Sequence, residues 1–145
     1  MNATIAKFGH PATLVAEYRH WVVLLRPTQP TLGSLVLAAK SDATAFSALE
    51  PAAFAELATV TADIEAALSN AVGYAKINYL MLMMVDPHVH FHVLPRYEGE
   101  RAAHGVPVAD TGWPGQPALN QAATLDAPQI AALVDWLKGV WPKPA

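Results

Sequence analysis

The most constraining feature of the sequence is the run HVHFH at residues 88–92, in which every second residue is histidine. In a β-strand, residues i, i+2 and i+4 point to one face at intervals of about 6.6 to 7 Å. The rings of His88, His90 and His92 would therefore share one face, and the apolar residues between them would share the other. We expect a strand over residues 88–94 with one apolar face and one titratable face.

Other segments of the chain also have the pattern of β-structure. Residues 13–40 contain the apolar runs Trp21–Leu25 and Ser34–Ala38, separated by a segment with two prolines and a glycine. This pattern predicts two or three strands. The apolar runs at 75–84 and 88–94 are split by a short polar segment, which predicts a β-hairpin.

Residues 47–71 change to a helical period. Ser47 precedes Glu50 by three residues, which is the spacing of a capping box; Pro51 suits a first helical turn, and Gly73 follows the end. The residues that recur at alternating steps of three and four are Phe54, Leu57, Thr61, Ile64 and Leu68. We therefore predict an amphipathic helix over this segment.

The last third of the chain predicts an irregular segment followed by a helix. Residues 96–120 are rich in glycine and proline, which disfavours long regular elements and indicates an ordered loop or a flexible flap. Asp126 can cap a helix over 126–141 that has Pro128 in its first turn. The expected fold is α+β. A single domain, 1–145, would hold an antiparallel sheet of about five strands, one central helix packed on it and a C-terminal helix.

Composition excludes several classes of protein. The chain has no cysteine, so disulfide and thiolate-metal frameworks are excluded. A hydrophobic fraction of 53% with 14% charged residues argues against disorder, and a net charge of -3 without a basic run argues against a nucleic-acid partner. The start of the chain lacks a signal-peptide pattern, and the longest apolar stretch, Tyr79–Val85, is too short for a membrane span. We expect a cytoplasmic protein without a membrane partner.

The histidine run itself allows three interpretations. It could be a solvated strand face that happens to carry histidine. It could bind a divalent metal, if the fold brings in a further ligand such as Glu98 or His104. It could also serve nucleophilic catalysis on a phosphate, because neutral imidazoles act as nucleophiles and as hydrogen-bond donors near pH 7.

The segment HVHFHVLPRY at residues 88–97 resembles the histidine triad (HIT) family of nucleotide hydrolases and transferases. The likeness covers roughly Thr13 to Tyr97 and implies a HIT-like fold and a homodimer. It also implies that His90 attacks the α-phosphorus of a nucleoside phosphoramidate or dinucleoside polyphosphate, forming a nucleotidyl-histidine that water resolves. His88 and His92 would donate to phosphate or leaving-group oxygens, with no cofactor required.

Three further residues are candidates for phosphate or nucleotide binding. Ser34 follows Gly33, where many family members have another histidine. Asn78 lies where a strand of the family often carries an asparagine, and Arg96 could bind a phosphate or merely cap the strand end. Residues 83–87 replace a Gly-Gln-Ser/Thr loop of the family. These departures motivate a second interpretation, a nucleotide-binding or metal-binding module with little or no turnover.

Overall fold

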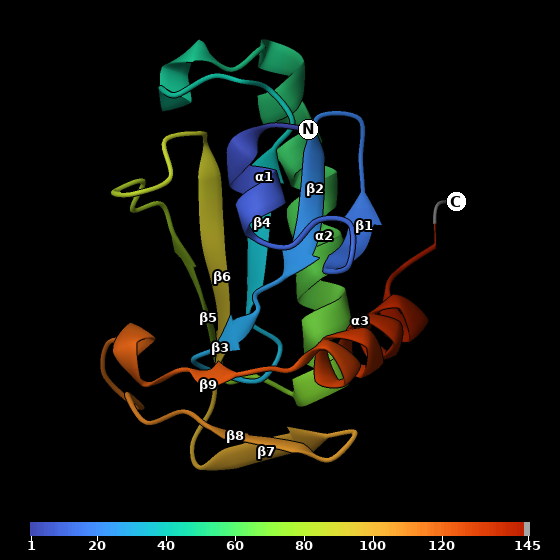
Figure 1. The fold of residues 1–145 in the computed structure, drawn as a ribbon, viewed down its shortest axis with the longest axis vertical. Coiled ribbons are helices and arrows are strands. Elements are labelled where there is room, and N and C mark those ends of the chain that lie inside the picture. The colour runs from blue at the N-terminus through green and yellow to red at the C-terminus, as the bar shows by residue number, and fades with distance from the viewer. Residues whose placement is uncertain (144–145) are drawn as a thin grey trace.

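The computed structural model describes residues 1–143. In that part of the chain, five strands form one antiparallel sheet with the order β1-β2-β4-β6-β5 (Figure 1). The strands of this sheet are β1 (Leu14–Glu17), β2 (Trp21–Leu25), β4 (Leu35–Ala39), β5 (Lys76–Leu80) and β6 (His90–Arg96). The α-helices are α1 (Ala3–Lys7), α2 (Pro51–Val72) and α3 (Ala127–Val140). This α+β architecture confirms the expected fold class.

The sheet has two different apolar faces. The main core is formed by one face of the sheet together with α2 and α3, and it includes Trp21, Val23, Leu35, Leu37, Val93, Ile64 and Leu133. On the opposite face, Ile5 of α1 packs on Val22, Leu24, Val36 and Ala38. Figure 1 shows α1 in front of the sheet and α2 behind it. Every residue of β2 and β4 is buried, which explains why these strands lack a polar alternation in sequence.

The long helices α2 and α3 begin and end near the residues that the sequence predicted, but the start of α2 lacks its predicted capping box. Gly73 closes α2 in the left-handed conformation, at φ 58°, and Asp126 forms a capping box with Gln129 at the start of α3. The predicted capping box between Ser47 and Glu50 is wrong. Ser47 belongs to the short 3₁₀-helix η1 (Phe46–Ala48), and Glu50 precedes α2 without a side-chain cap. The helix begins at Pro51, whose fixed φ suits a first turn.

The strand that carries the histidine run begins and ends two residues later than the predicted range of 88–94. Strand β6 begins at His90 and extends to Arg96, so His88 lies in the bend before it. The start is set by β4, whose last paired residue, Ala38, lies opposite His90. The end is set by β5, whose first residue pairs with Arg96. The hairpin of β5 and β6 is confirmed, with residues 81–89 as its connection.

The glycine- and proline-rich segment contains regular structure that the sequence did not predict. A hairpin of β7 (Glu100–Ala103) and β8 (Val106–Ala109) turns at His104 and Gly105, both at positive φ. The glycines here end short strands rather than prevent them. The 3₁₀-helix η2 (Leu119–Gln121) follows, and β9 (Ala123–Thr124) pairs with β3 (Thr28–Gln29). Among the described residues, no helix is long and apolar enough to cross a membrane.

Candidate active site

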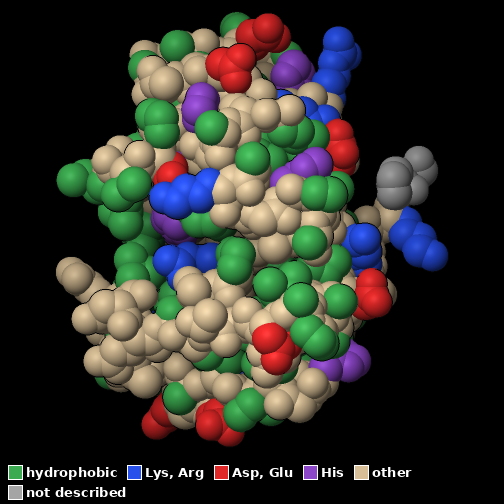
Figure 2. All heavy atoms as spheres, in the orientation of Figure 1, with side chains coloured by type: hydrophobic (Ala, Val, Ile, Leu, Met, Phe, Trp, Pro, Cys, Tyr) green, Lys and Arg blue, Asp and Glu red, His purple; other side chains and the backbone are tan. Residues whose placement is uncertain are grey.

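Two histidines of the run, His90 and His92, lie together on the sheet face that α1 covers. His90 and His92 extend from β6, are 2% and 9% exposed, and have ring centroids 5.2 Å apart. His88 lies immediately before the strand and is partly buried. Figure 2 shows basic side chains beside histidine on this face of the molecule, left of its centre. The alternation in the sequence therefore places His90 and His92 on one face as expected.

The ring of His90 is held by the backbone of the residue two positions earlier. Its Nδ1 atom lies 2.7 Å from the carbonyl oxygen of His88. A carbonyl oxygen only accepts hydrogen bonds, so Nδ1 carries the proton and donates it. In the neutral ring, Nε2 then holds an unshared lone pair. This is the protonation pattern that a nucleophilic imidazole needs.

The ring of His92 is held by an arginine from a neighbouring strand end. Nε of Arg26, directly after β2, donates to Nδ1 of His92 at 3.3 Å. A guanidinium group only donates, so the proton of His92 is on Nε2. Burial, the charge of Arg26 and the neighbouring His90 together lower the pKa of His92 to about 4, while Asp86 opposes them. His92 is therefore a neutral ring at pH 7 that donates through Nε2.

Helix α1 and Phe8, the residue directly after it, supply further contacts to the triad. Oγ1 of Thr4 lies 2.9 Å from Nδ1 of His88, and the ring of Phe8 lies 5.7 Å from the rings of both His90 and His92. Lys7 forms an ion pair of 2.8 Å with Asp86 in the connection that precedes His88. The lysine is 54% exposed, so this pair adds little stability.

Comparisons with known proteins agree with this arrangement. The model of the HIT domain matches residues 9–99, which is more than half of the chain. The chain belongs to the HIT family. A search of curated protein sequences finds no significant match.

Solved structures of histidine triad proteins have the fold of this HIT domain. The protein from Bradyrhizobium japonicum has a TM-score of 0.72 at 20% identity, covering 97% of each chain. The proteins from Sinorhizobium meliloti 1021 and Marinobacter aquaeolei VT8 each have a TM-score of 0.74 at 20% identity. They cover 97% of this chain and 95% and 94% of their own chains. At this level of identity the comparison establishes the fold alone.

Ser34 of the HIT domain is fully buried within a turn, and its side-chain hydrogen bonds are to Thr31 rather than to a ring of the triad. Its hydroxyl donates to the carbonyl oxygen of Thr31 at 2.7 Å and accepts from the backbone nitrogen of Thr31 at 3.2 Å. The amide of Gln29 closes the same turn by accepting from the backbone nitrogens of Gly33 and Ser34. The structure therefore shows Ser34 as part of the turn that precedes β4.

Asn78 and Arg96 lie together, but at the other end of β6 from His90. Arg96 is 3% exposed, and its Nε and Nη2 atoms donate to the two carboxylate oxygens of Asp110 at 2.7 and 3.1 Å. Nη1 donates to Oδ1 of Asn78 at 2.9 Å, and Nη2 also donates to the carbonyl of Gly115 at 2.9 Å. The charge of Arg96 is thus paired with Asp110, and its N–H donors bind the loop after β8 and Asn78.

Two side chains that hold triad rings, Arg26 and Thr4, were not predicted from the sequence. Arg26 could have been noticed as a lone cation directly after a buried strand, whereas the five residues of α1 are too few to show a period.

The two residues proposed as additional metal ligands, His104 and Glu98, lie elsewhere in the structure. His104 is in the β7–β8 turn, with its ring 6.3 Å from that of Trp136, and Glu98 is exposed. Within residues 1–143, no group of three or more side chains is arranged to hold a metal.

Proposed function

We propose that this HIT protein is a nucleotide hydrolase or nucleotidyl transferase that acts at the α-phosphate of a nucleoside phosphoramidate or dinucleoside polyphosphate. The reaction proceeds through a covalent nucleotidyl intermediate on His90. The observation that carries the proposal is the hydrogen bond from Nδ1 of His90 to the His88 carbonyl, because it leaves the lone pair on Nε2. Membership of the HIT family supports the nucleotide as substrate.

The proposed reaction has two displacements at phosphorus. In the first, Nε2 of His90 bonds to the α-phosphorus while the bond to the leaving nitrogen or oxygen breaks with its electron pair. In the second, a water oxygen attacks the same phosphorus, the bond to Nε2 breaks, and a nucleoside monophosphate is released with a proton to solvent. A nucleotide acceptor in place of water gives the transferase reaction. Dividing the reaction in this way replaces one difficult displacement by two easier ones.

The two flanking rings have different roles in this proposal. His92, kept neutral and donating through Nε2, hydrogen-bonds a non-bridging oxygen of the phosphate, and Arg26 places positive charge behind it. His88 is the more exposed ring and supplies the proton that the leaving group takes up. Catalysis then depends on donors aimed at the developing charge.

The proposal includes the partners expected from the sequence. The reaction needs no metal or other cofactor, and the protein acts as a homodimer. The connection between β5 and β6 supports a second copy as partner, because Leu82, Met84 and Val85 are 49%, 87% and 80% exposed beside the edge strand β5.

Release of AMP tests the proposed function. Adenosine 5′-phosphoramidate and diadenosine polyphosphates are incubated with the wild type and with His90→Ala, in the presence of a chelator. We expect the wild type to release AMP and the variant to lose this activity by several orders of magnitude, because the nucleophile is absent. His20→Ala is the matched control, since it removes a histidine from the β1–β2 turn and should keep full activity.

Two results would contradict the proposal. AMP release that persists in His90→Ala would exclude this residue as nucleophile. No AMP from any substrate with the wild type, together with thermal stabilisation by nucleotide or metal, would identify a binding module instead.

A further inference from the structure

The rings of His88 and His92 flank His90, but their Nδ1 atoms have partners of different hydrogen-bonding chemistry. Nδ1 of His92 accepts from Nε of Arg26 at 3.3 Å, and a guanidinium group only donates. Nδ1 of His88 lies 2.9 Å from Oγ1 of Thr4, and a hydroxyl group can donate or accept. The two rings therefore differ in the number of protons that their surroundings allow.

His92 is restricted to one protonation state near neutral pH. A second proton, on Nδ1, would point at an N–H group of Arg26 and would bring two positive charges into contact. The pKa of this ring is lowered to about 4 by burial, and also by Arg26 and His90. His92 can therefore donate a hydrogen bond through Nε2, but it cannot take up and release a proton during a reaction at pH 7.

His88 has the freedom that His92 lacks. In the imidazolium form of His88, the Thr4 hydroxyl accepts the Nδ1 proton, and the second proton, on Nε2, is available to a substrate. When the Nε2 proton leaves, the ring is neutral and the hydrogen bond from Nδ1 to Thr4 is kept. The same partner thus serves both states of an acid–base cycle without a change of geometry.

The hydroxyl of Thr4 is fixed in the fold, although α1 has only five residues. Asn2 caps the helix by accepting from the backbone nitrogen of Ile5. Nδ2 of Asn2 also donates to two backbone carbonyl oxygens at and after the end of β4, at 2.9 and 3.0 Å. Ile5 is fully buried, and Thr4 is 2% exposed. Because His88 precedes β6 and has no strand pairing, the orientation of its ring depends on this hydroxyl.

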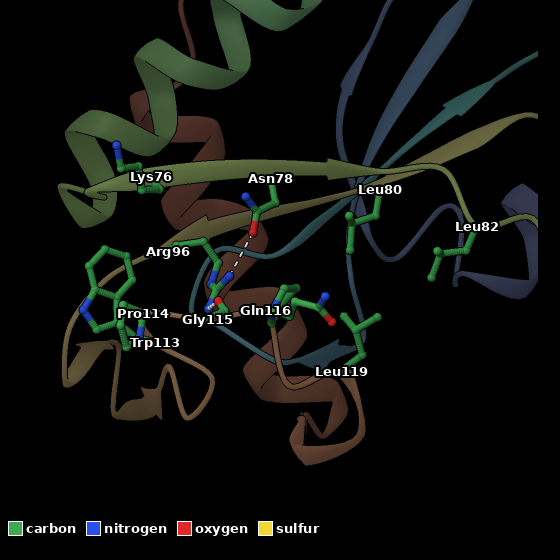
Figure 3. Close-up of a pocket in the computed structure, with 11 residues that line it drawn as sticks. Lys76, Asn78, Leu80, Leu82, Arg96, Trp113, Pro114, Gly115, Gln116 and Leu119 are labelled. Atoms are coloured by element: carbon green, nitrogen blue, oxygen red, sulfur yellow. Dashed lines mark hydrogen bonds between the residues drawn. The ribbon is translucent and has the colours of Figure 1, made fainter.

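The other cations on this side of the sheet already have partners. Arg96 lies at the far end of β6, and Figure 3 shows its side chain directed to Asn78, to whose Oδ1 it donates at 2.9 Å. A guanidinium group also keeps its protons near pH 7. Lys7, close to His88, is paired with Asp86 at 2.8 Å. Among these described groups, His88 is the one whose surroundings allow both the binding and the release of a proton.

We propose that Thr4 is a positioning residue that keeps a proton on Nδ1 of His88, so that Nε2 exchanges protons with the substrate. The proposal rests on the proposed function. In the first displacement, the Nε2 proton passes to the leaving nitrogen or oxygen, which also takes the electron pair of its broken bond to phosphorus. In the second, the lone pair on Nε2 takes a proton from the attacking water, and the imidazolium is restored.

Two substrates with different leaving groups separate this role from a structural one. The nitrogen of adenosine 5′-phosphoramidate needs a proton to leave as ammonia, whereas p-nitrophenolate leaves the p-nitrophenyl ester of AMP as a stable anion. General acid–base catalysis contributes about 10²–10⁴-fold. In Thr4→Val, we therefore expect kcat/KM to fall about thirtyfold for the phosphoramidate and less than about threefold for the ester. Thr4→Ser keeps the hydroxyl and should restore most of the rate.

Thr61→Val is the matched control for these measurements. Thr61 also lies in a helix, and its hydroxyl donates to the carbonyl oxygen of Leu57 at 2.6 Å. This helix, α2, packs on the opposite face of the sheet from α1 (Figure 1). We expect Thr61→Val to keep the wild-type kcat/KM with both substrates.

Nitrogen NMR of the histidine rings locates the proton without any turnover. The chemical shifts of Nδ1 and Nε2 distinguish the two neutral tautomers. At alkaline pH, we expect the His88 ring of the wild type to carry its proton on Nδ1, donated to Thr4. In Thr4→Val that acceptor is absent, and we expect the proton on Nε2 instead.

Every outcome supports or overturns the role of Thr4. Equal losses with both substrates in Thr4→Val, or no loss with the phosphoramidate, would overturn it, while the proposed function would still be judged by His90→Ala. If the wild type releases AMP from neither substrate, the proposed function fails and the NMR measurement decides. A wild-type His88 with its proton on Nε2 would then overturn the assignment, and an Nδ1 proton that is lost in Thr4→Val would support it.

Discussion

Replacing Asp110 by asparagine removes the negative charge that neutralises Arg96 inside the protein. The side chains of Arg96 and Asp110 are 4% and 1% exposed, and the carboxylate accepts two hydrogen bonds from the guanidinium and one from the backbone nitrogen of Tyr97. An asparagine has one acceptor oxygen and an NH₂ group, so at least one of these donors would face another donor. The arginine charge would also be left buried without a counter-charge.

The expected cost follows from that loss. Breaking a buried ion pair by removing one partner costs about 3–5 kcal/mol. For a domain of this size the cost corresponds to a fall in Tm of about 10–16 °C. We expect urea unfolding of Asp110→Asn, followed by tryptophan fluorescence, to give a free energy of unfolding lower by this amount. Glu17→Gln is the control, because its ion pair with Lys40 is on the surface and its loss should not change stability measurably.

A double variant tests the physical reason. In Arg96→Met with Asp110→Leu both charges are removed, so no uncompensated charge remains, and we expect part of the lost stability to return. The return is partial because the backbone nitrogen of Tyr97 and the carbonyl of Gly115 still lose their partners. A loss below about 1 kcal/mol in Asp110→Asn would refute the reasoning, since that is the size of a surface pair. A double variant that is less stable than Asp110→Asn would also refute it.

Two further predictions concern stability against pH and the oligomeric state. The pKa of His92 is lowered to about 4 from a usual value of 6.5, so between these values the unfolded chain binds more protons than the folded one. The free energy of unfolding should therefore fall on the order of 2–3 kcal/mol from pH 7 to pH 4, and His92→Gln should remove much of this slope in urea unfolding. Light scattering should give the mass of a dimer, and replacing Leu82, Met84 and Val85 together by serine should shift it toward the monomer; an unchanged mass would exclude this surface.

Elements with local signals could be predicted from the sequence. The helical period of α2, the glycine that ends it, Gly73, and the Asp126 cap of α3 can each be recognised from a short stretch of sequence. The alternation of the histidines also predicted the shared face of His90 and His92, whereas His88 lies before the strand. The first residue of β6 could not be predicted, because it depends on where β4 ends its pairing.

The surroundings of the candidate site depend on contacts between distant residues. The partners of Arg96 come from Asp110 and Gly115 in a segment without periodicity, and Thr4 meets His88 across 84 positions of the chain. No local sequence feature distinguishes an arginine that binds phosphate after a strand from one that holds a loop in place. The hydroxyl of Ser34 was expected to be available to a ligand, whereas in the structure it bonds within its own turn.

The most direct test of the central claim is the mass of the protein during turnover. The wild type is mixed with excess adenosine 5′-phosphoramidate and denatured within the first turnovers at alkaline pH, and its peptides are analysed by mass spectrometry. The account predicts an adenylyl group on the peptide that contains residues 88–92, attached to His90, and no adduct in His90→Ala. Steady AMP release without any adduct on the protein, at every quench time, would contradict a covalent intermediate on His90.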